Sequence, residues 1–299
     1  MTTGKSTTIT LNNGVEMPAL GLGVFQSAPE ETADAVETAL RDGYRLIDTA
    51  AAYNNERQVG EGIRRSGVDR SEVFVTTKLW LSDYGYDATL RAFDASLDKL
   101  GLDYLDMYLL HWPLPSDFEA TVGSWRAAEK LLADGRVRAI GVCNHSAAHL
   151  DALIARTDVV PAVNQVELHP YFGQPGLRDA AARLGVTTQA WSPIGGINMY
   201  WPAAPQAGRS PLTDPAVTAV AAKYGKTPAQ VVLRWHIEHA VSAIPKSVTA
   251  HRIAENIDIF DFSLTADEIA AIDALDTGVR GGPEPESITR GAFDIVIDA

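Results

Sequence analysis

The chain has 299 residues and a single cysteine, Cys143, so an intrachain disulfide is impossible and a reducing compartment, the cytoplasm, is expected. Its 38 acidic residues outnumber its 25 basic residues, and the resulting net charge of −13 argues against a nucleic-acid partner because it repels a phosphate backbone. The N-terminal segment lacks the apolar core of a signal peptide. No stretch is long and apolar enough to cross a bilayer, so we expect no membrane partner.

The first element in chain order is a predicted β-hairpin over residues 8–17, with the sequence TITLNNGVEM. Apolar residues alternate on both sides of the Asn-Asn-Gly sequence, which is a favourable hairpin turn. This segment lies outside the repeating pattern that follows, so we expect it to plug one end of the main structure.

Eight short apolar runs come next, and they alternate with longer segments of helical period. These runs cover residues 19–25, 44–50, 73–80, 105–112, 138–144, 162–168, 186–193 and 241–247. Helix starts are predicted by a possible capping box at Ser27 with Glu30, by another at Thr265 with Glu268, and by Thr227 before a proline.

Eight parallel strands with intervening helices need both faces of the sheet covered, and a closed (β/α)8 TIM barrel achieves this without exposed edges. We therefore predict one barrel domain over residues 1–299, with the N-terminal hairpin as its plug. A doubly wound open sheet would require a third glycine after Gly21 and Gly23, where Gln26 stands instead. The long segment 194–214 reads as a lid or binding loop.

Polar residues recur where the predicted strands end, which is where barrel enzymes place their chemistry. A lysine or histidine inside such an apolar strand is costly unless it is paired. Each of these polar residues taken singly has a simple structural explanation, but their recurrence at neighbouring strand ends favours a catalytic site. The residues at or near these ends are Asp48, Tyr53, Lys78, His111, Asn144, Gln165, Ser192 and Lys246.

Several motifs around these residues make the chain resemble the aldo-keto reductase family, in particular bacterial reductases of diketo-gluconate and methylglyoxal. The motifs are DTAAAYNNERQVG, TTKLW, YLLHWP, GVCNH, NQVELHP, AWSPIGG and IPKSVTAHRIAENIDIFDF. The resemblance implies reduction of small aldehydes and ketones with NADPH. It also implies a catalytic tetrad of Asp48, Tyr53, Lys78 and His111. We expect no metal ion.

Elementary electrostatics gives each member of this tetrad a task. A lysine ammonium about 4 Å from the Tyr53 phenol would favour the phenolate by up to roughly 4 kcal/mol, so we expect Lys78 to lower the pKa of Tyr53. Asp48 would neutralise and orient Lys78. Neutral His111 would hold the carbonyl oxygen while Tyr53 donates its proton.

The resemblance also assigns residues to the cofactor. Asn144 and Gln165 would bind the nicotinamide carboxamide, Trp191 would stack on its ring, and Ser192 lies beside them. Two cations and a hydroxyl near a helix N-terminus suit a phosphate monoester, so we expect NADPH rather than NADH. The residues at that end are Lys246, Ser247, Arg252, Glu255 and Asn256.

The substrate side is predicted to be aromatic and mostly apolar, since Phe25, Trp80, Trp112 and Trp201 fall near the same end of the barrel. This favours small apolar carbonyl substrates, with sugar-derived carbonyls possible through the polar loop 194–214. Three features depart from the family pattern: Cys143 replaces a serine, His145 replaces a phenylalanine, and the C-terminal tail is long.

Other functions remain to be weighed against a reductase. A short-chain dehydrogenase would need lysine at position 57, where Arg57 stands. The pairs His145–His149 and His236–His239 have helical spacing, but a solvated helix face explains them better than a metal site. An NADPH-binding regulatory or channel-associated subunit is the main alternative, and a barrel hydrolase is a weaker one. We expect the protein to be a monomer.

Overall fold

A closed barrel of eight parallel strands forms the centre of the computed structural model, which describes residues 7–195 and 209–298. Each strand pairs in parallel with its neighbour in chain order. Parallel bridges from Leu20 to Ala243 and from Gly23 to Lys246 join the first strand to the last. The predicted barrel is therefore confirmed. Its strands are β3 (Leu22–Gly23), β4 (Leu46–Asp48), β5 (Phe74–Leu79), β6 (Leu105–Leu110), β7 (Val137–Cys143), β8 (Val163–Glu167), β9 (Thr187–Trp191) and β10 (Ser242–Ala243).

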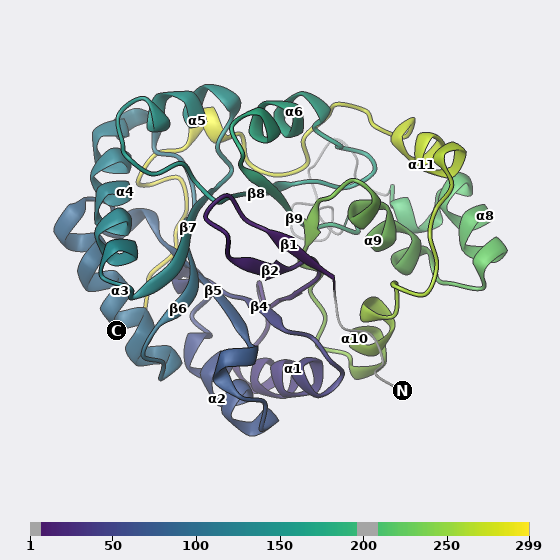
Figure 1. Ribbon diagram of the computed structural model, residues 1–299, viewed down its shortest axis with the longest axis horizontal. Helices are drawn as coiled ribbons and strands as arrows, with labels where there is room; N and C mark the ends of the chain where they lie inside the picture. Colours follow the sequence, from purple (N-terminus) through teal and green to yellow (C-terminus); the bar gives the residue numbers. More distant parts are fainter. Residues whose placement is uncertain (1–6, 196–208, 299) are drawn as a thin grey trace.

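Helices surround this barrel and cover its outer face (Figure 1). In the first helix the buried residues Ala33, Val36 and Leu40 are spaced three and four apart, so one stripe faces the strands. The helices are α1 (Pro29–Arg41), α2 (Glu56–Ser66), α3 (Tyr86–Leu100), α4 (Phe118–Ala133), α5 (Ala147–Ile154), α6 (Pro175–Arg183), α8 (Pro215–Tyr224), α9 (Pro228–Glu238), α10 (Ala250–Ile257) and α11 (Ala266–Asp273). None of the described helices is long and apolar enough to cross a membrane.

Two of the three predicted helix starts are confirmed. Thr227 and Thr265 each cap a helix through a reciprocal capping box. The box predicted at Ser27 is wrong, because α1 begins at Pro29 with Ala28 as its N-cap. A residue that precedes proline avoids helical backbone angles, so Ala28 stays extended and the helix starts one position later than a Ser27 cap requires.

The N-terminal hairpin lies across one end of the barrel, as predicted (Figure 1). It consists of β1 (Thr8–Thr10) paired antiparallel with β2 (Glu16–Pro18), and its Met17 is buried with residues of the barrel interior. Turn residues Asn12 and Asn13 donate to Pro161 O at 3.0 Å and Arg138 O at 2.9 Å, both near strand starts. The plug therefore closes the N-terminal end of the barrel and leaves the C-terminal end for a site.

The prediction of solvated faces for the paired histidines is wrong for one member of each pair. His145 and His236 are 0% exposed. Their rings contact the carbonyl oxygens of Cys143 and Pro193, each at 2.9 Å. Burial lowers the pKa of both to about 3, so both are neutral core residues.

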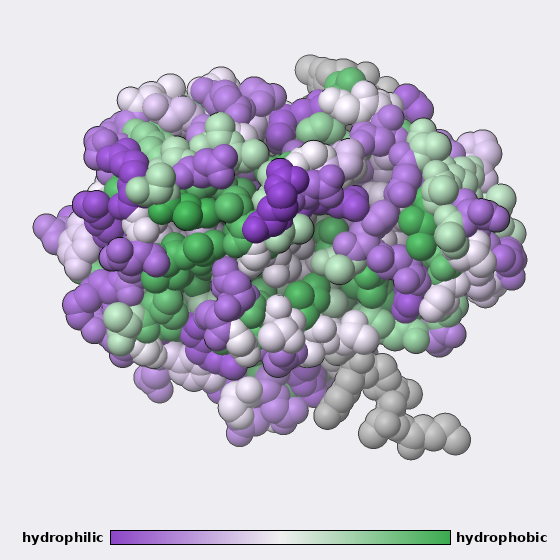
Figure 2. Space-filling view, turned by 45° about the horizontal axis from the view of Figure 1, so that its top comes forward, coloured by the Kyte–Doolittle hydropathy of each residue, from purple (hydrophilic) through white to green (hydrophobic). Residues whose placement is uncertain are grey.

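The outer surface carries few large apolar side chains in the described part of the chain. Hydrophilic residues cover most of the outer edge of the face in Figure 2, and hydrophobic residues show between them toward the middle. Among the described residues only Tyr86, Val279 and Val296 are large, hydrophobic and exposed.

Candidate active site

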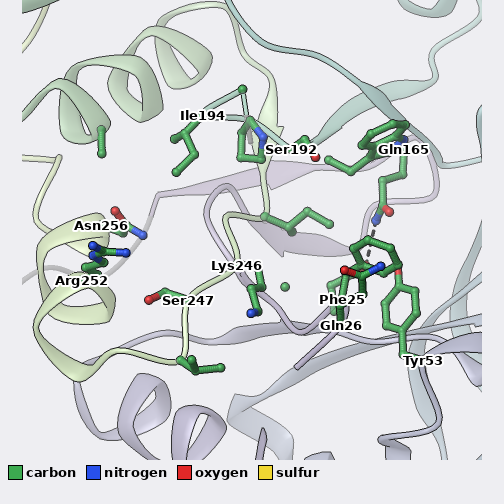
Figure 3. A pocket seen from close by; sticks show the side chains of 18 of the residues that line it. Phe25, Gln26, Tyr53, Gln165, Ser192, Ile194, Lys246, Ser247, Arg252 and Asn256 are labelled. Atoms are coloured by element: carbon green, nitrogen blue, oxygen red, sulfur yellow. Dashed lines mark hydrogen bonds between the residues drawn. The ribbon is translucent and has the colours of Figure 1, made fainter. Parts of the chain in front are cut away.

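A cavity of ≈ 1060 Å³ opens at the C-terminal end of the barrel. Within residues 7–195 and 209–298, every residue that the sequence assigned to the site lines this cavity except Lys78, which lies behind Tyr53. The site residues form two groups in Figure 3: Tyr53 and Gln165 lie on one side, while Arg252 and Asn256 project from α10 on the other. Lys246 and Ser247 lie between them, so the cavity is long enough to hold an extended ligand.

The core of the site is a buried ammonium group with three oxygen partners. Lys78, on β5, is 0% exposed. Its Nζ lies 2.5 Å from Oδ1 of Asp48, 2.9 Å from the carbonyl oxygen of Thr49 and 3.3 Å from Oη of Tyr53. Three donors meet three acceptors, so the ammonium is fully satisfied and its position is fixed.

The prediction that the pKa of Tyr53 is lowered is wrong. Burial raises the pKa of Tyr53 to about 12, and the Lys78 charge opposes that rise without overcoming it. For Lys78, burial lowers the pKa, but the charges of Asp48 and Tyr53 together raise it above its usual value. Both groups therefore keep their protons at neutral pH, and Lys78 limits how weak an acid the buried phenol becomes.

His111 completes this end of the cavity from the position just after β6. Its ring is edge-on to Tyr53, with the ring centroids 5.7 Å apart, and it packs 5.0 Å from the ring of Trp80. Burial, followed by repulsion from Lys78, lowers its pKa well below the usual value. The imidazole is therefore neutral, as expected.

Two side-chain amides face the same part of the cavity. Asn144 donates from Nδ2 to His111 O at 3.1 Å and accepts from Trp191 Nε1 at 2.8 Å. Gln165 donates from Nε2 to Oδ2 of Asp48 at 2.8 Å. These contacts leave one N–H of Asn144 and Oε1 of Gln165 to bind a carboxamide, which has a matching acceptor and donor. Cys143 is buried and does not line the cavity.

The far end of the cavity is basic, although the whole chain is acidic. Among the described residues, neither Lys246 nor Arg252 forms a salt bridge with a carboxylate. Ser247 and Asn256 lie beside them, and Glu255 accepts a hydrogen bond from Thr227 at 2.7 Å. A cation in the first turn of α10, Arg252, and another in the segment that leads into this helix, Lys246, suit a phosphate group, so these residues fit the adenosine end of NADPH.

The C-terminal tail supplies cavity residues that the sequence analysis missed. Phe293 and Ile295 line the cavity, and the Phe293 ring lies 5.4 Å from Trp80 and 5.5 Å from Trp112. Phe25 lines the same region, with its ring 5.1 Å from that of Tyr53. Apolar residues at positions 293, 295 and 297 were a signal for an extended segment packed on one side, although Val296 between the last two interrupts the alternation.

Both flanks of this tail are tied to the barrel. Arg290 donates to the carbonyl oxygen of Leu81 at 3.1 Å. Asn54, next to Tyr53, donates to Val296 O at 2.9 Å and accepts from the backbone N–H of Asp298 at 3.0 Å. The tail is therefore an integral wall of the site. The expected contribution of Trp201, and most of the loop 194–214, lies outside the described residues.

This combination of a plugged barrel, an aspartate-paired lysine behind a tyrosine, and a long cavity with a basic end defines an oxidoreductase of carbonyl compounds and alcohols. The chain belongs to the aldo/keto reductase family, whose model matches residues 19–277.

Named relatives agree with this assignment. The chain is 60% identical to morphine 6-dehydrogenase of Pseudomonas putida over 97% of this chain and 98% of the relative. It is 46% identical to glyoxal reductase of Bacillus subtilis over 96% of this chain and 99% of the relative. Among solved structures, a Bombyx mori aldo-keto reductase in complex with NADP matches with a TM-score of 0.86 and 36% identity, over 93% of this chain and 95% of that one.

Proposed function

We propose that this protein reduces aldehydes and ketones to alcohols with NADPH, and that Tyr53 donates the proton. The observation that carries the proposal is the 3.3 Å contact between Nζ of Lys78 and Oη of Tyr53, beside the neutral ring of His111. A protonated phenol backed by a fixed positive charge is an acid whose conjugate base is stabilised at the moment it forms.

Each residue then has a defined task. NADPH supplies the hydride that the carbonyl carbon accepts. His111 donates a hydrogen bond to the carbonyl oxygen and so directs the growing negative charge toward Tyr53. Tyr53 gives its proton to that oxygen, because an alkoxide is a stronger base than a phenolate. Lys78 stabilises the phenolate left behind, and Asp48 holds Lys78 in place.

The amides and the tryptophan orient the cofactor in this proposal. Asn144 donates to the carboxamide oxygen and Gln165 accepts from the carboxamide N–H. Trp191, fixed by its hydrogen bond to Asn144, covers one face of the ring. Ser192 shapes the adjoining wall of the cavity.

At the basic end, Arg252 is assigned to the 2'-phosphate of NADPH, with Lys246, Ser247, Glu255 and Asn256 around the same nucleotide. Arg252→Ala should raise the KM for NADPH by about tenfold or more, since a charged hydrogen bond to phosphate is lost. The KM for NADH, which lacks this phosphate, should change little. Steady-state kinetics with both cofactors measure the difference, and Arg252→Lys serves as a partial rescue. An equal rise for the two cofactors would remove Arg252 from the phosphate site.

The substrate wall suits carbonyl compounds with an apolar body. Phe25, Trp80, Trp112, Phe293 and Ile295 surround the space next to Tyr53 and His111. A relative named morphine 6-dehydrogenase and a relative named glyoxal reductase indicate that close family members differ widely in substrate size. We assign to this chain aldehydes and ketones that carry a ring or an alkyl chain, with glyoxal-sized compounds as poorer substrates.

Phe293→Ala tests this substrate class. The KM for an aromatic aldehyde or a cyclic ketone should rise about tenfold, because a buried phenyl ring contributes roughly 1.5–3 kcal/mol of contact with an apolar ligand. The KM for glyoxal and for NADPH should stay near the wild-type values. Val296→Ala, on the exposed part of the same tail, is the matched control. A uniform loss across the whole panel would mean that Phe293 only stabilises the tail.

We further propose that residues 1–299 form one domain and that the protein works as a cytoplasmic monomer. The scarcity of exposed large hydrophobic residues in the described ranges supports a monomer, because stable dimer interfaces are more apolar. Mixing the protein with NADPH and a panel of aldehydes separates the enzyme from an NADPH-binding regulatory subunit. Only the enzyme oxidises NADPH with turnover, so only the enzyme lowers the nicotinamide absorbance.

A further inference from the structure

Gln189 is a buried polar residue in the barrel interior that the proposed reaction does not yet use. It lies in the middle of β9 and is 2% exposed. A buried side-chain amide is costly unless its oxygen and nitrogen both find partners. Gln189 does find them, and the identity of these partners connects it to the reaction centre.

A chain of hydrogen bonds runs from Asp48 through two glutamines to β10. Nε2 of Gln165 lies 2.8 Å from Oδ2 of Asp48 and 2.8 Å from Oε1 of Gln189. Nε2 of Gln189 lies 3.0 Å from Oγ of Ser242, which is 0% exposed. Gln189 also places Nε2 within 3.9 Å of the sulfur of Met17 on the N-terminal plug.

The orientation of the side-chain amides of Gln165 and Gln189 follows from which of their partners can donate and which can accept hydrogen bonds. The carboxylate of Asp48, paired with Lys78, only accepts hydrogen bonds, so Gln165 must turn Nε2 toward it. The same nitrogen faces Gln189, which must therefore present Oε1. The other end of Gln189, Nε2, then meets the hydroxyl of Ser242. Both hydrogens of the Gln165 amide nitrogen are consumed in the barrel interior.

As a consequence, Gln165 offers the cavity its oxygen alone. We propose that Gln189 is a positioning residue that fixes the Gln165 amide in this orientation, so that the site binds the N–H side of a carboxamide at Gln165. The inference rests on the proposed role of Gln165 in holding the nicotinamide. Without the acceptor on Gln189, one Gln165 N–H would lie buried and unpaired, and only the contact with Asp48 would hold the amide in this orientation.

Gln189→Met is the direct test, because it preserves the side-chain length and removes the acceptor. Loss of one oriented hydrogen bond should raise the Kd for NADPH by about fivefold to tenfold, measured by quenching of tryptophan fluorescence. The Kd for adenosine 2',5'-bisphosphate, which has no nicotinamide, should not change. A purely structural role for Gln189 would weaken both ligands together, and that result would overturn the inference.

A conservative variant supplies the rescue. Gln189→Glu keeps an oxygen opposite Gln165, and burial favours its protonated form, whose hydroxyl can reach Ser242. It should restore most of the NADPH affinity that Gln189→Met loses. Thr188→Val, one residue earlier on the same strand and also buried, is the matched control and should alter neither ligand. Failure of Gln189→Glu to rescue would count against the orienting role.

Gln165→Met separates this inference from the proposed function. If it leaves NADPH binding unchanged, the assignment of Gln165 to the carboxamide is wrong and the proposed site must be revised. If it weakens NADPH binding while Gln189→Met does not, the assignment stands and only the positioning role of Gln189 is rejected.

Discussion

Tyr53→Phe should lower kcat for carbonyl reduction by about a thousandfold, because general acid catalysis contributes factors of roughly 100 to 10,000. The ring, its contacts with Phe25 and His111, and the cavity shape are all retained by phenylalanine. The Kd for NADPH should therefore stay close to the wild-type value. Stopped-flow measurement of a single turnover reports the chemical step, and fluorescence titration reports cofactor binding.

Tyr86→Phe is the control for removal of a tyrosine hydroxyl, since Tyr86 is exposed on α3 and does not line the cavity. It should leave kcat unchanged. Turnover of Tyr53→Phe near the wild-type rate would assign the proton to another group. The loss of NADPH binding together with turnover would show instead that the substitution had damaged the whole site.

The barrel was predicted from the sequence for a physical reason, and the tetrad from polar residues at the strand ends together with the resemblance to the aldo-keto reductase family. Strands buried on both faces are almost wholly apolar, so Lys78 within β5 and His111 directly after β6 stand out. The parallel order of the strands brings their C-terminal ends together. The hairpin plug could also be predicted, because apolar residues that alternate on both sides of an Asn-Asn-Gly sequence are typical of a β-hairpin. The pairing of strands far apart in the chain, including that of the first with the last, followed from the barrel topology.

Other features depend on three-dimensional context that no local pattern carries. The tail residue Phe293 meets Trp80 and Trp112 only because the chain crosses the barrel end after its last helix. The role of Gln189 depends on its register opposite Gln165, which β-pairing fixes. The direction of the pKa shift of Tyr53 depends on the balance between burial and the Lys78 charge, and spacing in the sequence does not give that balance.

Lys78→Met should have a double effect, because it removes the charge behind Tyr53 and leaves Asp48 buried without a cation. Breaking a buried ion pair from one side costs about 3 to 5 kcal/mol of unfolding free energy. The loss of the ammonium also raises the pKa of Tyr53 further, because the Lys78 charge opposes the effect of burial, so the phenol becomes a weaker acid and kcat should fall at least about a hundredfold.

The stability loss in Lys78→Met should depend on pH. Burial already raises the pKa of Asp48, and Lys78 is the main group that opposes this rise. In the variant the folded-state pKa is therefore higher still, and a group with a raised folded pKa stabilises the fold only while it is protonated. The deficit in unfolding free energy relative to the wild type should thus be smaller near about pH 5 and larger near about pH 8.

Urea unfolding at the two pH values measures this deficit, and Asp48→Asn/Lys78→Met is the matched control because it removes both charges. The double variant should be more stable than Lys78→Met at the higher pH and should show little of the pH dependence, while remaining inactive. This result would separate the free energy of unfolding from kcat. It would mean that the Asp48 carboxylate affects stability only through its pairing with Lys78, whose charge the reaction needs. A deficit in Lys78→Met that is the same at both pH values would mean that Asp48 does not take up the proton, and the coupling between these two residues would be refuted.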